Sequence, residues 1–213
     1  MRGKFITLEG LEGSGKSTQI AVLERCLKER GIPVVVTREP GGTPLAERLR
    51  EIVLNPGQER ISPVSELLIM FAARAVHLDN LIRPQLEQGT WILCDRFTDA
   101  SFAYQGAGRG ISEEFIATLE MLVQGALQPD LTFLLDLPVT VGLKRAAARR
   151  GPSAPDRFEQ EDPAFFERVR ARFLELARRH RQRIKVIDAD RPQADVSAAL
   201  LTALDVLLDS REQ

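Results

Sequence analysis

A glycine-rich octapeptide near the N-terminus restricts the possible folds of this chain more than any other segment does. Residues 10–17, GLEGSGKS, match the pattern G-x-x-x-x-G-K-[ST] at every defined position. A short apolar run at residues 5–8 precedes the octapeptide, and a helical pattern follows it to about Arg30. Because this motif binds phosphate when it lies between a strand and a helix, the segment predicts an α/β fold with a nucleoside triphosphate site.

Each defined position of the octapeptide has a physical role in holding phosphates. The glycines let the backbone curl until successive N–H groups point at phosphate oxygens, and the N-terminus of the following helix adds positive potential. Lys16 carries a point charge on a flexible stem, and the Ser17 hydroxyl is a hard oxygen ligand suited to Mg²⁺. The expected ATP-binding residues here are Gly10, Leu11, Glu12, Gly13, Ser14, Gly15, Lys16, Ser17 and Thr18.

Four further apolar runs alternate with helical patterns along the rest of the chain. They cover residues 33–37, 91–95, 131–136 and 184–187, and each is apolar throughout rather than alternating. Strands of this kind are typical of parallel sheets that helices cover on both faces. The expected fold is a three-layer, doubly wound α/β sheet of about five parallel strands, in a single domain of 213 residues. One long helix is expected from Ser62 to about Gln88.

Composition excludes several other classes of protein. The formal net charge is −1, which is not typical of a polyanion-binding protein. Cys26 and Cys94 fall within helix and strand patterns without metal-ligand spacing, so two buried, reduced thiols are expected. The N-terminal apolar run is too short for a signal peptide, and no stretch approaches the roughly 18 apolar residues of a membrane span. These observations predict a soluble, cytoplasmic protein with no membrane partner.

The phosphate motif alone leaves the reaction open. A switch GTPase would carry an Asn-Lys-x-Asp motif, which the sequence lacks, and ATP-driven motors usually have longer chains. A small protein with this motif and neither signature is most often a kinase of a small molecule. Residues 143–185 carry 13 Lys and Arg against six Asp and Glu, so the alternative from another class is a nucleotide-dependent switch that docks nucleic acid through this basic segment.

Four segments in a fixed order resemble one kinase family. They are GLEGSGKST at residues 10–18, TREPGGT at 37–43, FAARAVH at 71–77 and DRFTDASFAYQGAGRG at 95–110. Together they resemble the bacterial thymidylate kinases over nearly the whole chain. The resemblance implies the P-loop nucleoside monophosphate kinase fold and transfer of the γ-phosphoryl group of ATP to dTMP, giving dTDP and ADP for dTTP synthesis. It also implies Mg²⁺ as cofactor and a homodimer, with no nucleic acid partner. The enzyme alternative is a kinase of another nucleoside or deoxynucleoside monophosphate.

The resemblance further implies an acceptor site. In the family an aromatic ring stacks on thymine and an arginine donates to its O4, which assigns Phe71 and Arg74, three residues apart on one helix face. Without the family, core packing is the alternative for Phe71. The single histidine of this helix, His77, is interpreted as structural. The expected substrate-binding residues are Arg38, Glu39, Phe71, Arg74, Arg96, Ser101, Tyr104 and Gln105.

Three further positions indicate the catalytic centre. Asp95 ends a predicted buried strand, where a carboxylate holds Mg²⁺ or its waters, with turn capping as the alternative. Arg96 offers a pair of donors for phosphate, and the resemblance places it on the acceptor phosphate or on the group being transferred. Glu12 is a carboxylate in an anion-binding loop, so it must face a hydroxyl or a metal, and the resemblance assigns it to the acceptor 3′-hydroxyl or the Mg²⁺ shell. The expected catalytic residues are Lys16, Arg96, Arg157, Asp95 and Glu12, and the expected metal ligands are Ser17 and Asp95.

A Gly-Pro-Ser-Ala-Pro loop bordered by arginines is expected to form a lid over ATP at about residues 149–158. Arg149 and Arg150 are expected to bind ATP. Arg157 is expected to stabilise the transferring phosphoryl group, because Asp156 beside it is placed to orient its guanidinium. The alternative for Arg157 is a role in ATP binding alone.

Overall fold

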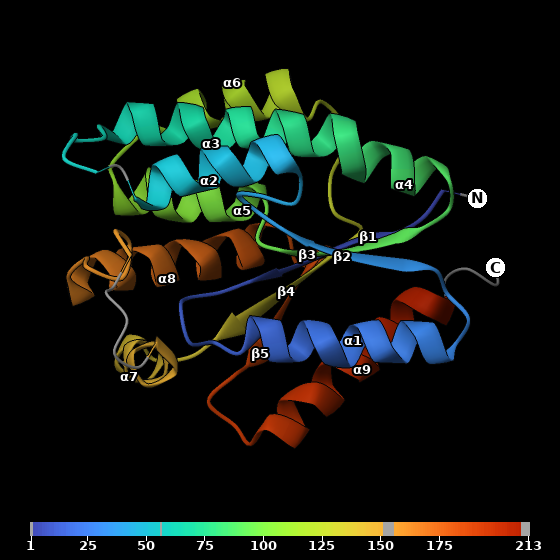
Figure 1. Ribbon diagram of the computed structural model, residues 1–213. Helices are drawn as coiled ribbons and strands as arrows, with labels where there is room; N and C mark the ends of the chain where they lie inside the picture. The colour runs from blue at the N-terminus through green and yellow to red at the C-terminus, as the bar shows by residue number, and fades with distance from the viewer. Residues whose placement is uncertain (1, 56, 151–155, 210–213) are drawn as a thin grey trace.

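Five parallel strands form the centre of this protein, in the order β2-β3-β1-β4-β5 (Figure 1). The computed structural model describes residues 2–55, 57–150 and 156–209. The strands are β1 (Phe5–Glu9), β2 (Val34–Arg38), β3 (Trp91–Asp95), β4 (Leu131–Asp136) and β5 (Ile184–Asp188). Every pairing between neighbours is parallel, so the predicted five-stranded parallel sheet is confirmed.

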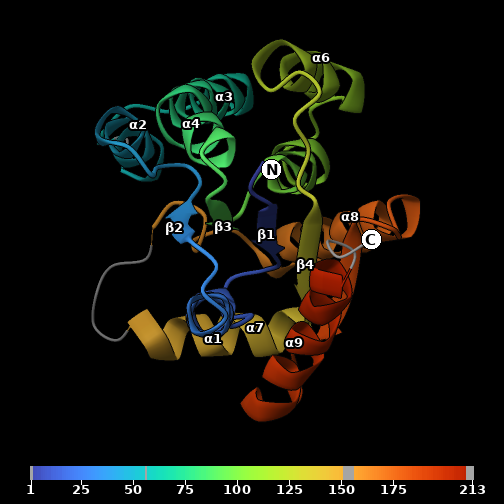
Figure 2. The same cartoon turned by 90° about the vertical axis from the view of Figure 1, so that its right-hand side faces the viewer.

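Helices cover both faces of the sheet, as Figure 2 shows. On one side lie α1 (Lys16–Glu29), α7 (Val139–Arg150) and α9 (Gln193–Asp209). On the other side lie α2 (Pro44–Leu54), α3 (Pro63–His77), α4 (Arg83–Glu87) and α6 (Glu113–Val123). The short α5 (Thr98–Ser101) continues into the π-helical η2 (Phe102–Gly108), and α8 (Pro163–Arg179) packs against η2, β4 and β5.

Alternate residues of the central strands enter different halves of the core. Ile6 and Leu93 pack towards α1 and α9, whereas Phe5 and Ile92 pack towards α4. The expectation of strands covered on both faces therefore holds for β1, β3 and β4, whose residues are almost all buried. It is wrong for the edge strands, where Val36 is 41% exposed and Val186 is 48% exposed, because an edge strand has one neighbour and less helical cover.

The long helix predicted from Ser62 begins where the sequence indicates. The Ser62 hydroxyl accepts the N–H of Ser65 at 3.0 Å, and Pro63 occupies the first turn. The helix then passes through a π-helical segment, η1 (Leu78–Ile82), before α4 ends at Glu87. The π-helical turn was not predicted, because nothing in the apolar pattern distinguishes it from an α-helix.

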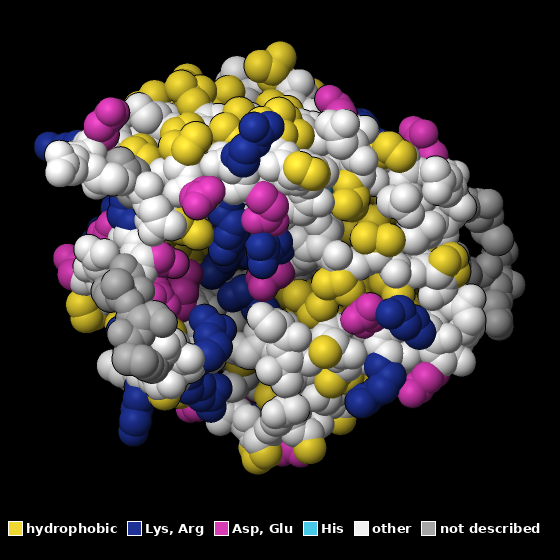
Figure 3. Space-filling model, in the orientation of Figure 1, with side chains coloured by type: hydrophobic (Ala, Val, Ile, Leu, Met, Phe, Trp, Pro, Cys, Tyr) yellow, Lys and Arg dark blue, Asp and Glu magenta, His cyan; other side chains and the backbone are white. Residues whose placement is uncertain are grey.

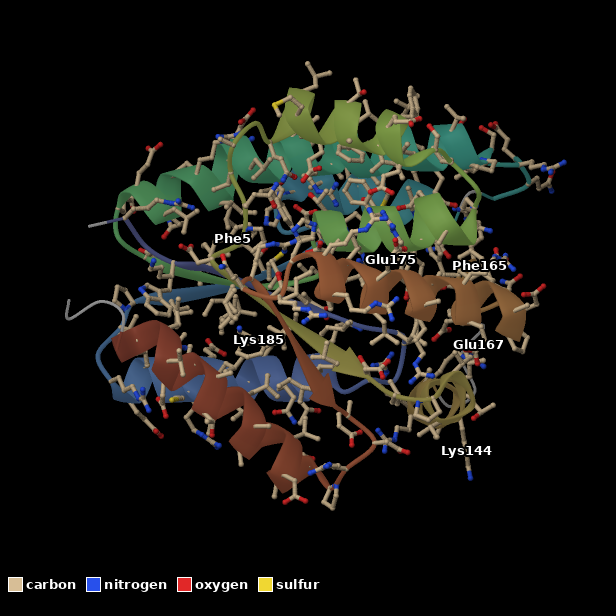
Figure 4. The ribbon with its side chains drawn as sticks, turned by 180° about the vertical axis from the view of Figure 1, so that it is seen from behind. Phe5, Lys144, Phe165, Glu167, Glu175 and Lys185 are labelled. Carbon is tan, nitrogen blue, oxygen red and sulfur yellow. The ribbon has the colours of Figure 1, made fainter. Side chains whose placement is uncertain are left out.

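The two cysteines differ in burial. Cys94 is buried but Cys26 is partly exposed, and both are free thiols, so the expectation of two buried thiols is wrong for Cys26. Lys144 projects from α7 away from the sheet, while Phe165 lies on the part of α8 that faces η2 (Figure 4). Within the described residues, no helix has the length and apolar character to cross a membrane. Residues 151–155 of the expected lid lie outside the described part of the chain.

Candidate functional site

The carboxyl ends of β1, β2 and β3 meet at one edge of the sheet. The register pairs Leu8 and Arg38 with Asp95 on either side of β3. The loops that leave these strands therefore start side by side, as expected at a switch point of a parallel sheet. In the orientation of Figure 3, lysine and arginine side chains gather in a hollow beneath α2.

The loop after β1 has the curled backbone that the sequence motif predicts. Gly13 and Gly15 have φ of 74° and 94°, in the left-handed region, and Gly15 is the N-cap of α1. A Cβ on Gly13 would lie 2.2 Å from the carbonyl oxygen of Gly142, so α7 packs directly against the loop. Ser17 and Thr18 are exposed at the start of α1, where N–H groups of a helix end face solvent.

Lys16 is folded back onto this loop. Its Nζ donates to the carbonyl oxygens of Gly10 at 3.2 Å and Leu11 at 3.1 Å. Burial, followed by repulsion from Arg96, lowers the pKa of Lys16 to about 8. The hydroxyl of Ser14 is buried without a hydrogen-bond partner among the described residues. The loop thus holds a cation and an unpaired hydroxyl at the position where the motif predicts phosphates.

Glu12 faces a hydroxyl, as its place in an anion-binding loop requires. Its carboxylate accepts the Tyr104 hydroxyl at 2.9 and 2.8 Å and the Arg96 Nη2 at 2.9 Å. The Arg96 guanidinium also lies 4.8 Å from the centroid of the Tyr104 ring, within the range of a cation–π contact. These three predicted residues therefore form one cluster beside the P-loop.

The backbone of Arg96 is held in a strained conformation. Its φ is 71°, in the left-handed region that a side chain with a Cβ disfavours. Its N–H donates to the Leu8 carbonyl at 2.9 Å, and the next N–H, of Phe97, donates to Glu9 Oε1 at 2.7 Å. The Arg96 Nη1 reaches the Gly10 carbonyl at 2.9 Å. Strand β1 therefore fixes the backbone at Arg96, and the loop after β1 fixes its side chain.

A cavity opens between this cluster and α3. Its lining includes Arg74, Ser101, Tyr104 and Gln105, which the sequence analysis assigned to the acceptor. Arg74 Nε donates to Glu39 Oε2 at 2.7 Å, and its Nη2 donates to the Ser101 hydroxyl at 3.2 Å. Its Nη1 is buried and has no partner among the described residues. Arg74 thus brings to the cavity lining a guanidinium with one nitrogen that no described residue satisfies. The lining residues are Glu12, Glu39, Pro40, Arg50, Leu54, Met70, Arg74, Arg96, Phe97, Ala100, Ser101, Tyr104, Gln105, Asp156 and Phe158.

Glu39 binds both Arg74 and His77, and so orients the Arg74 side chain. Its second oxygen lies 3.0 Å from His77 Nδ1, and His77 Nε2 lies 2.7 Å from the Thr37 hydroxyl. Arg74, Glu39 and His77 are all buried. The interpretation of His77 as structural is confirmed by its complete burial, and the chain of contacts shows what it supports.

Phe71, the residue expected to stack on the base, lies outside the cavity lining. Phe71 is 2% exposed and packs with Leu67 and Ile116, away from the cavity lining. Its ring lies 4.6 Å from the Arg74 guanidinium, which it supports from behind. Met70 lines the cavity instead. It lies four positions before Arg74, on the same face of the helix, whereas Phe71 lies three positions before Arg74 and points into the core.

The position of Arg38 also differs from expectation. Arg38 is exposed and forms an ion pair with Glu47 at 2.9 Å, outside the cavity lining. The hydrogen bond from Arg38 lowers the pKa of Glu47. Arg50 of α2 takes the expected place in the lining and donates to the Pro40 carbonyl at 2.9 Å. Arg50 was missed because its helix carries no motif.

The arginines that flank the expected lid have different surroundings. Arg149 is exposed and makes no hydrogen bond or ion pair in the described part of the chain, whereas Arg150 pairs with Glu159 at 2.9 Å. The expectation that Asp156 orients Arg157 is wrong. Asp156 Oδ1 accepts the backbone N–H groups of Phe158 and Glu159, each at 2.9 Å, and Arg157 is bound elsewhere, to Glu66 and the Val53 carbonyl.

Two predicted metal ligands lie at this edge of the sheet. Asp95 Oδ1 is buried without a hydrogen-bond partner among the described residues, which leaves a carboxylate oxygen for a cation or its waters. Ser17 presents its hydroxyl at the start of α1. No group of three or more His, Cys, Asp or Glu residues suited to a metal occurs in the described ranges. The unpaired carboxylate oxygen of Asp95 and the hydroxyl of Ser17 are hard oxygen donors, which fit Mg²⁺.

The basic segment is partly neutralised within the fold. Arg170 binds Asp136 through two nitrogens at 2.7 and 2.9 Å, and Arg183 binds Asp99 at 2.6 and 2.9 Å. Arg172 pairs with Glu113 at 2.7 Å. Arg170 thus ties α8 to β4, and Arg172 ties α8 to α6.

Comparisons with known proteins agree with this geometry. A family model described as thymidylate kinase matches residues 8–200. A thymidylate kinase of Pseudomonas savastanoi pv. phaseolicola is 56% identical over 211 residues, covering 99% of both chains. One from Alkalilimnicola ehrlichii is 56% identical and covers 95% of this chain and 93% of the relative. A crystal structure of thymidylate kinase from Ehrlichia chaffeensis aligns with a TM-score of 0.76 at 34% identity, covering 96% of this chain and 99% of that one.

Glu9 gives this site a testable dependence on pH. Burial, and then the charge of Asp99, raise the pKa of Glu9 from 4.5 to about 8. The unfolded chain therefore loses this proton near pH 4.5 while the folded protein keeps it, so the free energy of unfolding falls as pH rises from about 5 to about 8. Glu9→Gln keeps an oxygen for the Phe97 N–H and removes the titration. We expect the variant to gain stability relative to the wild type across that range, on the order of a few kcal/mol.

Urea unfolding at pH 5 and pH 8 measures this difference. Glu87→Gln, at an exposed position at the end of α4, is the control and should show no such trend. An equal stability difference between Glu9→Gln and wild type at both pH values would contradict the prediction.

Proposed function

This chain belongs to the thymidylate kinase family, and from that premise we propose how its residues transfer the γ-phosphoryl group of ATP to dTMP. The P-loop binds ATP, and the adjacent cavity binds dTMP with its base at Arg74 and its phosphate at Arg96 and Arg50. The observation that carries this assignment is Arg74, a residue of the cavity lining that Glu39 holds through Nε and whose buried Nη1 has no partner among the described residues. Thymine offers an acceptor at O4, and a buried donor without a partner costs free energy until one arrives.

The transfer step needs positioning more than proton removal. An oxygen of the dTMP phosphate forms a bond to the γ-phosphorus, and the bond from that phosphorus to the β–γ bridging oxygen breaks, releasing ADP. The attacking oxygen already carries negative charge, so no strong general base is required. Lys16 and Arg96 bind the charged oxygens of the phosphates in the transition state. Glu12 holds Tyr104 and Arg96 in place at 2.8–2.9 Å, and in this proposal it also faces the sugar hydroxyl.

Mg²⁺ is the proposed cofactor. Ser17 and Asp95 are the residues that would hold the ion or its waters, and the unpaired Oδ1 of Asp95 supports this choice. When bound, the ion neutralises charge on the β- and γ-phosphates. Ser14 and Thr18 complete the proposed contacts of the loop with ATP.

The proposed lid cation is Arg149, with Arg150 in support. Arg149 is exposed at the end of α7 and pairs with no other described residue, so its guanidinium is available to ATP. Arg157 is not proposed for this role, because it is bound to the buried carboxylate of Glu66. Helix α7 packs on Gly13 of the P-loop, which places Arg149 on an element that contacts the phosphate loop.

A coupled ADP-release assay across nucleoside monophosphates tests the proposed function. dTMP is expected to be the preferred acceptor, with dUMP, dCMP, dAMP and dGMP far less efficient. Equal turnover of several monophosphates would favour the broader kinase alternative. ATP hydrolysis that no monophosphate accelerates would contradict phosphoryl transfer altogether.

Arg74→Gln is predicted to relax the choice of base. Cytosine presents an amino donor where thymine presents O4, and two facing donors leave both unsatisfied. An amide can offer either a donor or an acceptor, so the ratio of kcat/KM for dTMP to that for dCMP should fall by on the order of 100-fold. The change also leaves Glu39 without its arginine, so the same measurement is made in Glu39→Gln and in the double variant. An unchanged ratio in a folded double variant would show that Arg74 does not read the base.

Alanine substitutions at Met70 and Phe71 should have different effects, the first on dTMP binding and the second on stability. Met70→Ala removes apolar surface from the cavity, which should raise the KM for dTMP about tenfold with little change in thermal stability. Phe71→Ala removes a buried ring, which should cost about 3–5 kcal/mol of unfolding free energy. Steady-state kinetics and urea unfolding of both variants make the comparison. A stable Phe71→Ala with the larger rise in KM would restore the stacking role to Phe71.

We also propose a homodimer through α3 and α6. These helices lie side by side (Figures 1 and 2) and expose Val64, Leu68, Phe115, Met121 and Leu122, the last two at 69% and 78%. An apolar patch of this kind on a soluble domain is typical of a contact surface. Leu68→Glu should convert the dimer to a monomer in sedimentation velocity, whereas Val206→Glu, on exposed α9, should not. A wild-type monomer at micromolar concentration would contradict the proposal.

A further inference from the structure

One buried carboxylate outside the reacting centre gathers donors from distant parts of the chain. Glu66 of α3 is fully buried. Its Oε1 accepts Gln105 Nε2 at 2.7 Å, and its Oε2 accepts Arg109 Nε at 3.2 Å and Arg157 Nη2. Three donors thus converge on a single side chain that the phosphoryl transfer does not use.

The cluster joins four segments that are far apart in sequence. Arg157 belongs to the last part of the expected lid and also donates through Nε to the Val53 carbonyl in α2, at 3.2 Å. Arg109 follows η2 and pairs through Nη1 with Glu161 at 2.5 Å. Glu66 itself belongs to the first turn of α3. A single carboxylate therefore links α2, α3, η2 and residues 156–158 to one another.

Three residues connect the Glu66 cluster to the cavity lining. Gln105, bound to Glu66, lines the cavity, and so do Asp156 and Phe158 on either side of Arg157. The Phe158 ring lies 5.2 Å from the Arg157 guanidinium and 5.6 Å from that of Arg109. It also contacts the Tyr104 ring edge-on at 5.9 Å. The two arginines held by Glu66 therefore hold the aromatic wall of the cavity.

The negative charge of Glu66 is what holds the two arginines together. If Glu66 is replaced by a neutral residue, Arg157 loses its only ion pair in the described part of the chain and retains the hydrogen bond to the Val53 carbonyl, whereas Arg109 retains its ion pair with Glu161. Two guanidinium groups left near each other with less negative charge repel, and removing one partner of a buried ion pair is strongly destabilising locally. Arg157 is 21% exposed in its side chain, so its easiest response is to turn outward and take Phe158 with it.

We propose that Glu66 is a positioning residue that holds residues 156–158 against the acceptor cavity, so that affinity for dTMP depends on a carboxylate that never touches it. The proposal rests on the proposed function, because it takes the cavity as the dTMP site. It gives Arg157 a role in binding the acceptor, through Phe158, in place of a role in the chemical step.

Glu66→Gln tests this role, because it should change the KM for dTMP without changing the KM for ATP or kcat. We expect the KM for dTMP to rise about tenfold, which corresponds to 1.4 kcal/mol, with the KM for ATP and the kcat within about twofold of wild type. Glu113→Gln is the matched control: Glu113 also pairs with two arginines, Arg172 and Arg179, but is half exposed and outside the cavity lining. It should leave both KM values unchanged. An equal rise in both KM values, or no rise for dTMP, would overturn the proposal.

Arg157→Gln is the second variant, for the case that Glu66→Gln does not fold. It leaves the buried Glu66 paired with Arg109 and Gln105, so we expect this variant to stay folded. A raised KM for dTMP with kcat retained supports positioning. A loss of kcat of about 10³ with unchanged KM, as for an arginine acting on the transition state, would overturn it. Wild-type turnover of dTMP is measured in the same assay, so a failure of the proposed function appears as absent wild-type activity.

Discussion

The hydrogen bond from the Phe97 N–H to the buried carboxyl of Glu9 is the contact on which the rest of the site depends. It exists because β1 and β3 are neighbours in the sheet, so that the last residue of one strand meets the turn that follows the other. The bond holds Arg96 in a left-handed conformation, and Arg96 in turn reaches the P-loop and Glu12. Phosphate loop and acceptor cavity are thereby built on one rigid edge.

Local signals were sufficient for the fold and for the phosphate site. The P-loop motif lies at its predicted place, and β3 has the predicted bounds of Trp91–Asp95, because an apolar run between a glycine and a charge leaves little choice. The capped start of α3 was predicted for the same reason, since Ser62 and Pro63 act within one helical turn. Such features depend on neighbours in sequence, which a single chain displays.

What escaped prediction depends on partners far away in the chain. Phe71 and Met70 are adjacent and both apolar, and only the packing of α3 against Ile116 decides which of them faces the cavity. Arg157 stands beside Asp156, yet it binds Glu66, 91 residues away in sequence. The resemblance to a family supplied roles for residues, but the geometry of long-range contacts assigned them differently at Phe71, Arg38 and Arg157.

In the proposed ATP site, the folded-back Lys16 would link nucleotide binding to the uptake of a proton. Its amine is bound to the carbonyl oxygens of Gly10 and Leu11, and burial lowers its pKa to about 8. Phosphate oxygens near the amine favour its charged form and raise that pKa again. In slightly alkaline solution, where part of the lysine is neutral, arrival of the nucleotide therefore draws a proton from solvent. By linkage, the affinity of the loop for ATP must weaken as protons become scarce.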